Sequence, residues 1–153
     1  MRRQLLACAA AIGTAVAVGF ALITVPAAAT HVPPVFVPGN QSCSALAPGT
    51  TELEVQPVVD GTVTDGTLTV TIDVRDTNSG QVFGWTSNIG VDAVFVKGGP
   101  NGNLYVYNPE ATEDTGLHAP LNPGNPNNQF FGLSHISFCY DVEEPTPTPT
   151  NTP

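Results

Sequence analysis

The sequence predicts an all-β protein, a single antiparallel β-sandwich of seven or eight strands in an Ig-like or jelly-roll style. Three observations support this prediction. Apolar and polar residues alternate over much of residues 46–107, turn residues separate the alternating stretches, and nothing after residue 30 has a helical period. The clearest stretch is Thr67–Arg75, where four apolar residues alternate with polar ones. Such alternation indicates a strand with one buried face and one face in water.

Further strands are expected on both sides of this stretch, because shorter alternating or apolar runs there are bounded by turn residues. Asp65-Gly66 is typical of a tight turn, Asp76–Gly80 is rich in turn residues, and Gly98–Gly102 is typical of a five-residue hairpin loop. The runs between these turns predict strands at 52–55, 62–64, 82–85, 91–96 and 103–107.

The last strand is expected at Gly132–Val142. Alternation places four apolar side chains on one face and two other side chains on the opposite face. The first set is Ile136, Phe138, Tyr140 and Val142, and the second set is His135 and Cys139.

A long loop is expected before this last strand. Residues 108–129 contain four prolines, two glycines and five asparagines, which is too many breakers for a strand or a helix. Loops of this length in compact domains are usually functional. Any ligand site is therefore expected within residues 108–131.

The first 29 residues have the order of an export signal. Arg2 and Arg3 precede an apolar run from 5 to 25, and Ala27 and Ala29 are the small residues of a cleavage site. The exported protein is expected to begin at Thr30, by the general or the twin-arginine route. An uncleaved signal would instead be a membrane anchor, the only contact with a membrane that the sequence suggests.

The other end of the chain is a spacer. Residues 143–153 are acidic at first and then alternate Thr with Pro, a composition that forms an extended segment without a core. The domain organisation is therefore a signal at 1–29, a β-sandwich at 30–142 and a spacer at 143–153. This arrangement predicts a secreted or cell-surface protein.

Charge excludes one class of partner. The chain without its signal keeps all 13 acidic residues against only Arg75 and Lys97, a formal charge of −11. Such a surface repels phosphate, so nucleic acid is not an expected partner. Because the acidic residues are dispersed along the chain, they are interpreted as a solvated surface.

The two cysteines that remain after signal removal are expected to pair. Cys43 and Cys139 lie near the two ends of the domain, and their spacing fits neither a zinc site nor a redox motif. In an oxidising compartment two such residues form a structural disulfide.

Three blocks of sequence support a resemblance. Val94–Pro100, Asp114–Pro120 and Gly132–Tyr140, in this order, resemble an uncharacterised module of secreted bacterial envelope proteins. The resemblance covers roughly residues 40 to 142. It implies an envelope location and a modular protein, in which a Thr/Pro-rich tail often follows, and it carries over no catalytic residue.

Two sets of residues are candidates for ligand contact. Aromatic rings together with a histidine of the long loop could form a sugar-stacking platform, although a small β domain also needs aromatic residues in its core. This set is Trp85, Tyr105, Tyr107, His118, Phe130 and Phe131. Imidazole and carboxylate groups suit zinc or a related ion, which gives Asp114, His118 and His135 as an alternative metal set.

The leading functional hypothesis is a non-catalytic cell-surface module for adhesion, glycan contact or structural spacing. It requires no cofactor, and its partner is an unidentified surface ligand or glycan. The alternative is a small metal-dependent secreted enzyme or metal-binding protein that uses the loop at 108–131.

Overall fold

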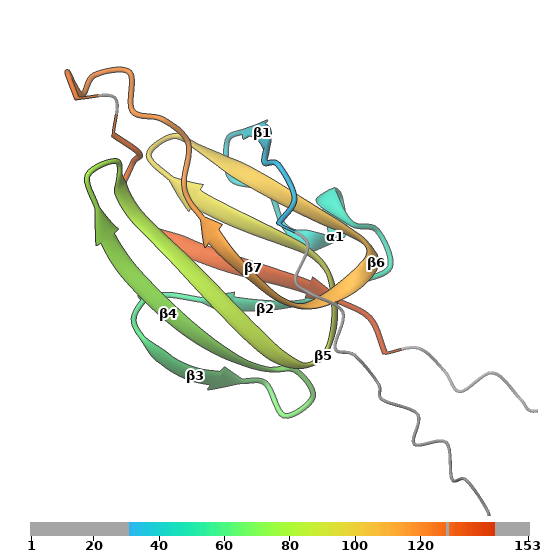
Figure 1. The fold of residues 1–153 in the computed structure, drawn as a ribbon. Helices are drawn as coiled ribbons and strands as arrows, with labels where there is room; N and C mark the ends of the chain where they lie inside the picture. The colour runs from blue at the N-terminus through green and yellow to red at the C-terminus, as the bar shows by residue number, and fades with distance from the viewer. Residues whose placement is uncertain (1–30, 128, 143–153) are drawn as a thin grey trace, which may run out of the picture.

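The computed structural model describes residues 31–127 and 129–142. The predicted signal at 1–29 and the predicted spacer at 143–153 lie outside the described residues. The described chain is all-β, as the sequence predicts (Figure 1). Its elements are β1 (Val35–Pro38), α1 (Cys43–Leu46), β2 (Thr51–Val55), β3 (Gly61–Thr64), β4 (Thr69–Thr77), β5 (Gly80–Gly98), β6 (Asn101–Leu117) and β7 (His135–Tyr140).

The strands form one antiparallel sheet that folds over on itself. The order along its main path is β1-β6-β5-β4-β3, while β7 pairs with both β5 and β2. The first half of β5 pairs with β4, and its second half pairs with β7 from Ala93↔Cys139 to Lys97↔His135. The ladder between β5 and β6 is irregular between Thr86 and Ala93. Irregularities of this kind bend a strand, so β5 and β6 pass from one layer of the fold to the other.

Two layers result from this bend. One contains β3, β4, the first half of β5 and the second half of β6. The other contains β2, β7, the second half of β5, the first half of β6 and β1. The fold is therefore sandwich-like, although its strands remain hydrogen-bonded in one continuous sheet.

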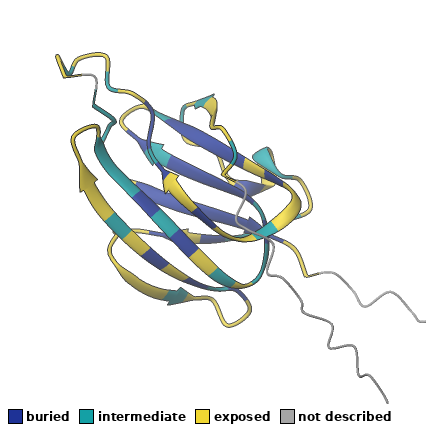
Figure 2. Ribbon diagram, in the orientation of Figure 1, coloured by how far each residue is buried: buried dark blue, intermediate teal, exposed yellow. Residues whose placement is uncertain are grey.

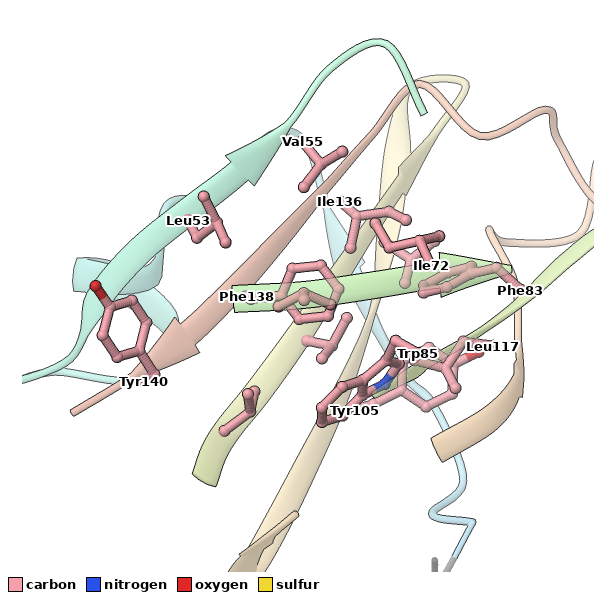
Figure 3. Packing of buried hydrophobic residues seen from close by; sticks show 14 of the residues in the cluster. Leu53, Val55, Ile72, Phe83, Trp85, Tyr105, Leu117, Ile136, Phe138 and Tyr140 are labelled. Atoms are coloured by element: carbon pink, nitrogen blue, oxygen red, sulfur yellow. The ribbon is translucent and has the colours of Figure 1, made fainter. Parts of the chain in front are cut away.

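The core lies between the two layers (Figures 2 and 3). Trp85 of β5 is at its centre, with its ring centroid 5.5 Å from that of Phe138 in β7 and 5.7 Å from that of Tyr107 in β6. Ile136, Phe138 and Tyr140 all belong to this cluster, which confirms the inner face predicted for the last strand. Val142 lies beyond the end of β7 and is 65% exposed, so its predicted place on that face is wrong.

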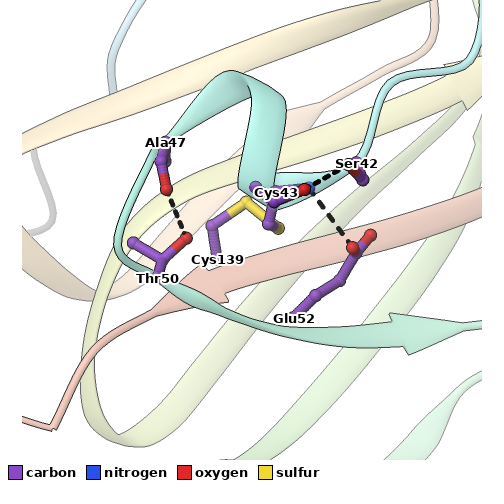
Figure 4. Close-up of a disulfide and its surroundings, with 7 residues drawn as sticks. Ser42, Cys43, Ala47, Thr50, Glu52 and Cys139 are labelled. Atoms are coloured by element: carbon purple, nitrogen blue, oxygen red, sulfur yellow. Dashed lines mark hydrogen bonds between the residues drawn. A yellow bond between two sulfur atoms is a disulfide. The ribbon is translucent and has the colours of Figure 1, made fainter.

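A second, smaller cluster lies on the outer side of β7. Cys43, Ala93, Phe95, Leu104 and Cys139 form it, with Leu46 and Ala47 of the α1 segment packed against it. The predicted disulfide is present, joining Cys43 and Cys139, and the Cys43 amide donates to Glu52 Oε2 at 3.2 Å (Figure 4). Because this segment covers the outer side, all six residues of β7 are buried.

Several boundaries differ from those predicted. The strands expected at 82–85 and 91–96 are parts of the single strand β5, and β6 continues past Pro109 to Leu117. The second half of β6 has β5 as its only strand partner within the described chain. Proline and glycine are tolerated in a strand at such an edge, which explains why breakers did not end β6.

The hairpin between β5 and β6 is tighter than expected. Gly98 pairs with Asn101, so the turn is Gly99-Pro100 and not a five-residue loop. Gly99 has φ +59°, and a Cβ there would approach the Phe131 ring to 2.7 Å. A side chain larger than hydrogen would therefore separate this turn from the segment packed on it.

No helix among the described residues is long and apolar enough to cross a membrane.

Candidate functional site

The connection between β6 and β7, residues 118–134, is a long segment that is fixed to the rest of the fold. The Phe130 amide donates to the Ser79 carbonyl at 2.7 Å, and the Ser134 amide donates to the Lys97 carbonyl at 2.8 Å. Gln129 Nε2 donates to the carbonyl of Asn78 at 3.1 Å. These bonds hold the connection against the β4–β5 turn and against the end of β5. We call residues 118–134 the β6–β7 loop.

The base of the β6–β7 loop is built around His118. Its imidazole stacks on Phe130 with the ring centroids 3.7 Å apart and the planes 8° from parallel. Its amide donates to the Tyr105 hydroxyl at 2.9 Å. His118 Nδ1 lies 2.8 Å from the Ala119 carbonyl oxygen, a hydrogen bond that requires the proton on Nδ1. The role of His118 in the structure is thus to anchor the loop.

The tip of the loop, residues 122–127, is mostly exposed and is shaped by its own asparagines. Asn122 Oδ1 accepts from the Gly124 amide at 3.0 Å, and Asn125 Oδ1 accepts from the Asn127 amide at 2.9 Å. Asparagine side chains that bond two residues onward set turn geometry in this way. The whole β6–β7 loop contains no Asp, Glu, Lys or Arg, in contrast to the acidic chain around it.

The predicted aromatic platform does not form. Trp85, Tyr105 and Tyr107 are at most 6% exposed and belong to the core between the layers. They point inward because they alternate with outward residues along β5 and β6. Phe130 and Phe131 are half-buried at the base of the loop, where His118 stacks on Phe130 and the Tyr105 hydroxyl reaches His118 from the core.

The predicted metal set also does not form. Asp114 is buried and accepts hydrogen bonds from the Tyr107 hydroxyl at 2.9 Å and from the Thr115 amide at 2.7 Å. Its other contact is His31 Nδ1, at 3.2 Å. His135 is buried in β7, with its ring centroid 6.2 Å from that of Phe95. Within the described ranges, Asp114, His118 and His135 are not among the groups whose ligand atoms converge.

Three other carboxylates do converge. Asp92, Glu110 and Asp141 each place one oxygen within 4.8 Å of the others, the only such group of His, Cys, Asp or Glu in the described part of the chain. They line a cleft of about 700 Å³ whose apolar wall includes Leu46 and Val106. No sequence pattern indicates this group, because bends in β5 and β6 bring together residues that lie far apart in the chain. Exposed carboxylates often gather in this way without an ion.

The pKa values of the three tyrosines are raised in the fold. Burial raises the pKa of Tyr105 to about 12, and burial together with the negative charge of Asp114 raises the pKa of Tyr107. The pKa of Tyr140 is raised by the hydrogen bond that its hydroxyl donates to Asp65 Oδ2 at 2.6 Å, and burial adds to the effect. The same bond lowers the pKa of Asp65. All three tyrosines are structural, and the Tyr105 hydroxyl is bonded to the main chain of His118 at the base of the β6–β7 loop.

Comparison of the chain with protein families, with curated proteins and with solved structures finds no match. The β6–β7 loop is therefore the candidate site on the evidence of its geometry and chemistry.

Proposed function

We propose that this chain is an exported, non-catalytic surface module that presents the tip of the β6–β7 loop to a glycan or another neutral surface ligand. The observation that carries the proposal is the position and fixation of the loop. It is held by main-chain bonds from Phe130 and Ser134, and β7 separates it from Val142 (Figure 1). A spacer that follows Val142 would attach at the end of the molecule opposite the β6–β7 loop. The loop would then face away from the point of attachment and toward a distant partner.

The chemistry of the loop supports a neutral, hydroxylated ligand. Asparagine amides offer both donors and acceptors, and the loop contains no Asp, Glu, Lys or Arg that would select an ionic partner. The described residues of the loop are also held by hydrogen bonds before binding, which reduces the conformational entropy lost when a ligand is bound. The disulfide is compatible with an oxidising, extracellular location.

Binding to an array of immobilised glycans tests this proposal. In the test variant, residues 122–129 are replaced by an Asn-Gly turn, which can close Leu121 onto Phe130, its partner across a β-bridge. We expect this variant to lose about tenfold or more in affinity, equal to about 1.4 kcal/mol, while its melting temperature stays close to that of the parent.

The matched control removes hydroxyls from a different exposed surface. Thr71 and Thr86 are exposed and paired on the outer side of β4 and β5, so T71A/T86A should bind as the parent does. Equal affinity of the parent and the loop variant would exclude the loop as the site. A parent protein that binds no glycan on the array would remove glycan contact from the proposal.

Export is tested separately by intact-mass measurement on protein from the culture medium. A mass that begins at Thr30 is expected. Retention of residues 1–29 would make the protein membrane-anchored.

A further inference from the structure

We propose that the fold divides under tension into a short strap that yields and a core that the Cys43–Cys139 disulfide protects. The strap is defined as His31–Ser42. The inference concerns how load passes through the chain and is independent of what the β6–β7 loop binds. Its failure is therefore distinguishable from failure of the proposed function.

The path of load follows from where the disulfide lies. Cys139 is three residues before Val142, and Cys43 follows the strap directly. When the chain is pulled at both ends, force passes along the strap, crosses the sulfur–sulfur bond and leaves through Tyr140–Val142. Once the strap has detached, the chain between the two cysteines carries no tension while the bond is intact. That interval contains β2–β6 and most of β7, and therefore nearly all of the core.

The strap is attached much more weakly than the core. Its strand β1 has four residue pairs with β6, from Val35↔Leu104 to Pro38↔Asn101, and it lies at the edge of the sheet. Val35 and Phe36 are 57% and 59% exposed, so Val37, packed against the second cluster, is the main apolar contact of β1. A strand with so little burial detaches before a packed layer does.

Two polar contacts also attach the strap, beside the partly buried Val32 and Val37, which pack against the main core and the second cluster. His31 Nδ1 lies 3.2 Å from Asp114 Oδ1, and the Gly39 amide donates to Asn101 Oδ1 at 3.1 Å. The His31 side chain is 53% exposed, which makes its contact accessible to water and weak as an anchor. The strap ends at Ser42, where the buried Cys43 begins the protected part of the fold.

Single-molecule pulling on the full chain tests this division. A handle is attached at each end, and reference domains of known strength are placed in series. With the bond intact we expect only the strap to be released. Its 12 residues extend by about 40 Å at 3.3–3.6 Å per residue. After a reductant is added, a further increment of about 330 Å should appear, because the cysteines are 96 residues apart.

Variants of the strap sharpen the test. His31→Ala should lower the force of the first release and leave the second increment unchanged. Gln41→Ala is the matched control, since its side chain bonds only to the Pro38 carbonyl within the strap itself.

Three outcomes would overturn the proposal. An increment of about 330 Å with the bond intact would show that the core carries load. No release below the strength of the reference domains would show that the strap does not yield. The absence of the large increment after reduction would show that the strands, and not the disulfide, resist the load. C43S/C139S provides a second route to the last result if the reductant does not reach the buried bond.

Discussion

The two halves of β5 have different surroundings, although they belong to one strand. In the first half, Phe83 and Trp85 point into the core while Thr86 on the other face is exposed. In the second half both faces are buried, since Val94 and Val96 face the main core and Phe95 packs in the cluster that contains the disulfide. The difference arises because the α1 segment and its neighbours in the second cluster cover the outer face of the second half of β5 and leave the outer face of the first half open. Burial of a strand thus reports how many layers cover it.

The largest expected effect is on the doubly covered half. Loss of the disulfide in Cys43→Ser should destabilise the protein by about 4–5 kcal/mol, because the bond closes a loop of nearly 100 residues in the unfolded chain. Urea unfolding of the oxidised parent and of the variant measures this difference, and mass spectrometry of the parent should find no free thiol. Two alkylatable thiols in freshly exported monomer would contradict the prediction.

Substitution on the outer face of β5 compares the two halves directly. Phe95→Ala should cost about 3–5 kcal/mol, because Phe95 is fully buried in the second half. Thr86→Ala is the control on the exposed outer face of the first half, and it should change stability by no more than about 0.5 kcal/mol. Similar losses in the two variants, measured by urea unfolding, would mean that the halves are not covered differently.

Titration of the tyrosines probes the dry core on which both halves pack. The chain has three tyrosines, and the pKa of each is raised in the fold, that of Tyr105 to about 12. We therefore expect little phenolate absorbance from the folded protein at pH 10, where half of the tyrosines in urea-unfolded protein should be ionised.

The sign of the tyrosine effect on stability follows from the same shifts. Raised pKa values favour the folded state below pH 10, and this contribution is lost as the pH rises through the folded values. Normal titration of even one tyrosine in the folded protein would contradict the burial described for Tyr105 and Tyr107 or the hydrogen bond described for Tyr140.

The smallest expected effect is at the edge of the core. Because the bond from Tyr140 lowers the pKa of Asp65, it stabilises the fold fully above about pH 4, and this contribution is lost as the pH falls through the folded value. Asp65 is exposed, so we expect a coupling between Asp65→Asn and Tyr140→Phe of only about 0.2–1 kcal/mol at pH 7. Double-mutant unfolding at pH 7 and pH 3 measures it. Asp76→Asn is the control for removing a carboxylate that does not contact Tyr140. A coupling energy that is larger at pH 3 than at pH 7 would contradict the predicted pH dependence.

The sequence predicted the features that depend on local pattern. Alternation at 67–75 corresponds to β4, which begins two residues later at Thr69, and the inner face of β7 is predicted correctly as far as Tyr140. The turn predicted at Asp65-Gly66 lies within a connection of four residues, 65–68, because Thr64 pairs with Thr69. The Cys43–Cys139 bond is predicted because the chain after the predicted signal has only these two cysteines.

The features that depend on long-range pairing were not predictable from pattern. Composition indicated a loop from Asn108, but pairing with β5 keeps residues up to Leu117 in β6. The strand β1 is only four residues long, and α1 is a single turn, so neither produces a periodic signal. Composition predicts Asp114 in the loop, where it is a candidate metal ligand, whereas in β6 its side chain is buried in the core.

The position of β7 also determines when the fold can be completed. A chain emerges from a ribosome or an export channel with its N-terminus first, and β7 is the last strand to appear. Within the described chain, β2 pairs only with β7, and the second half of β5 needs β7 as its neighbour. Until residue 140 is free, β2 has no partner strand and Cys43 has no Cys139 with which to react. Folding and oxidation must therefore wait for the end of the domain, and truncation before β7 should leave exposed apolar strands that aggregate.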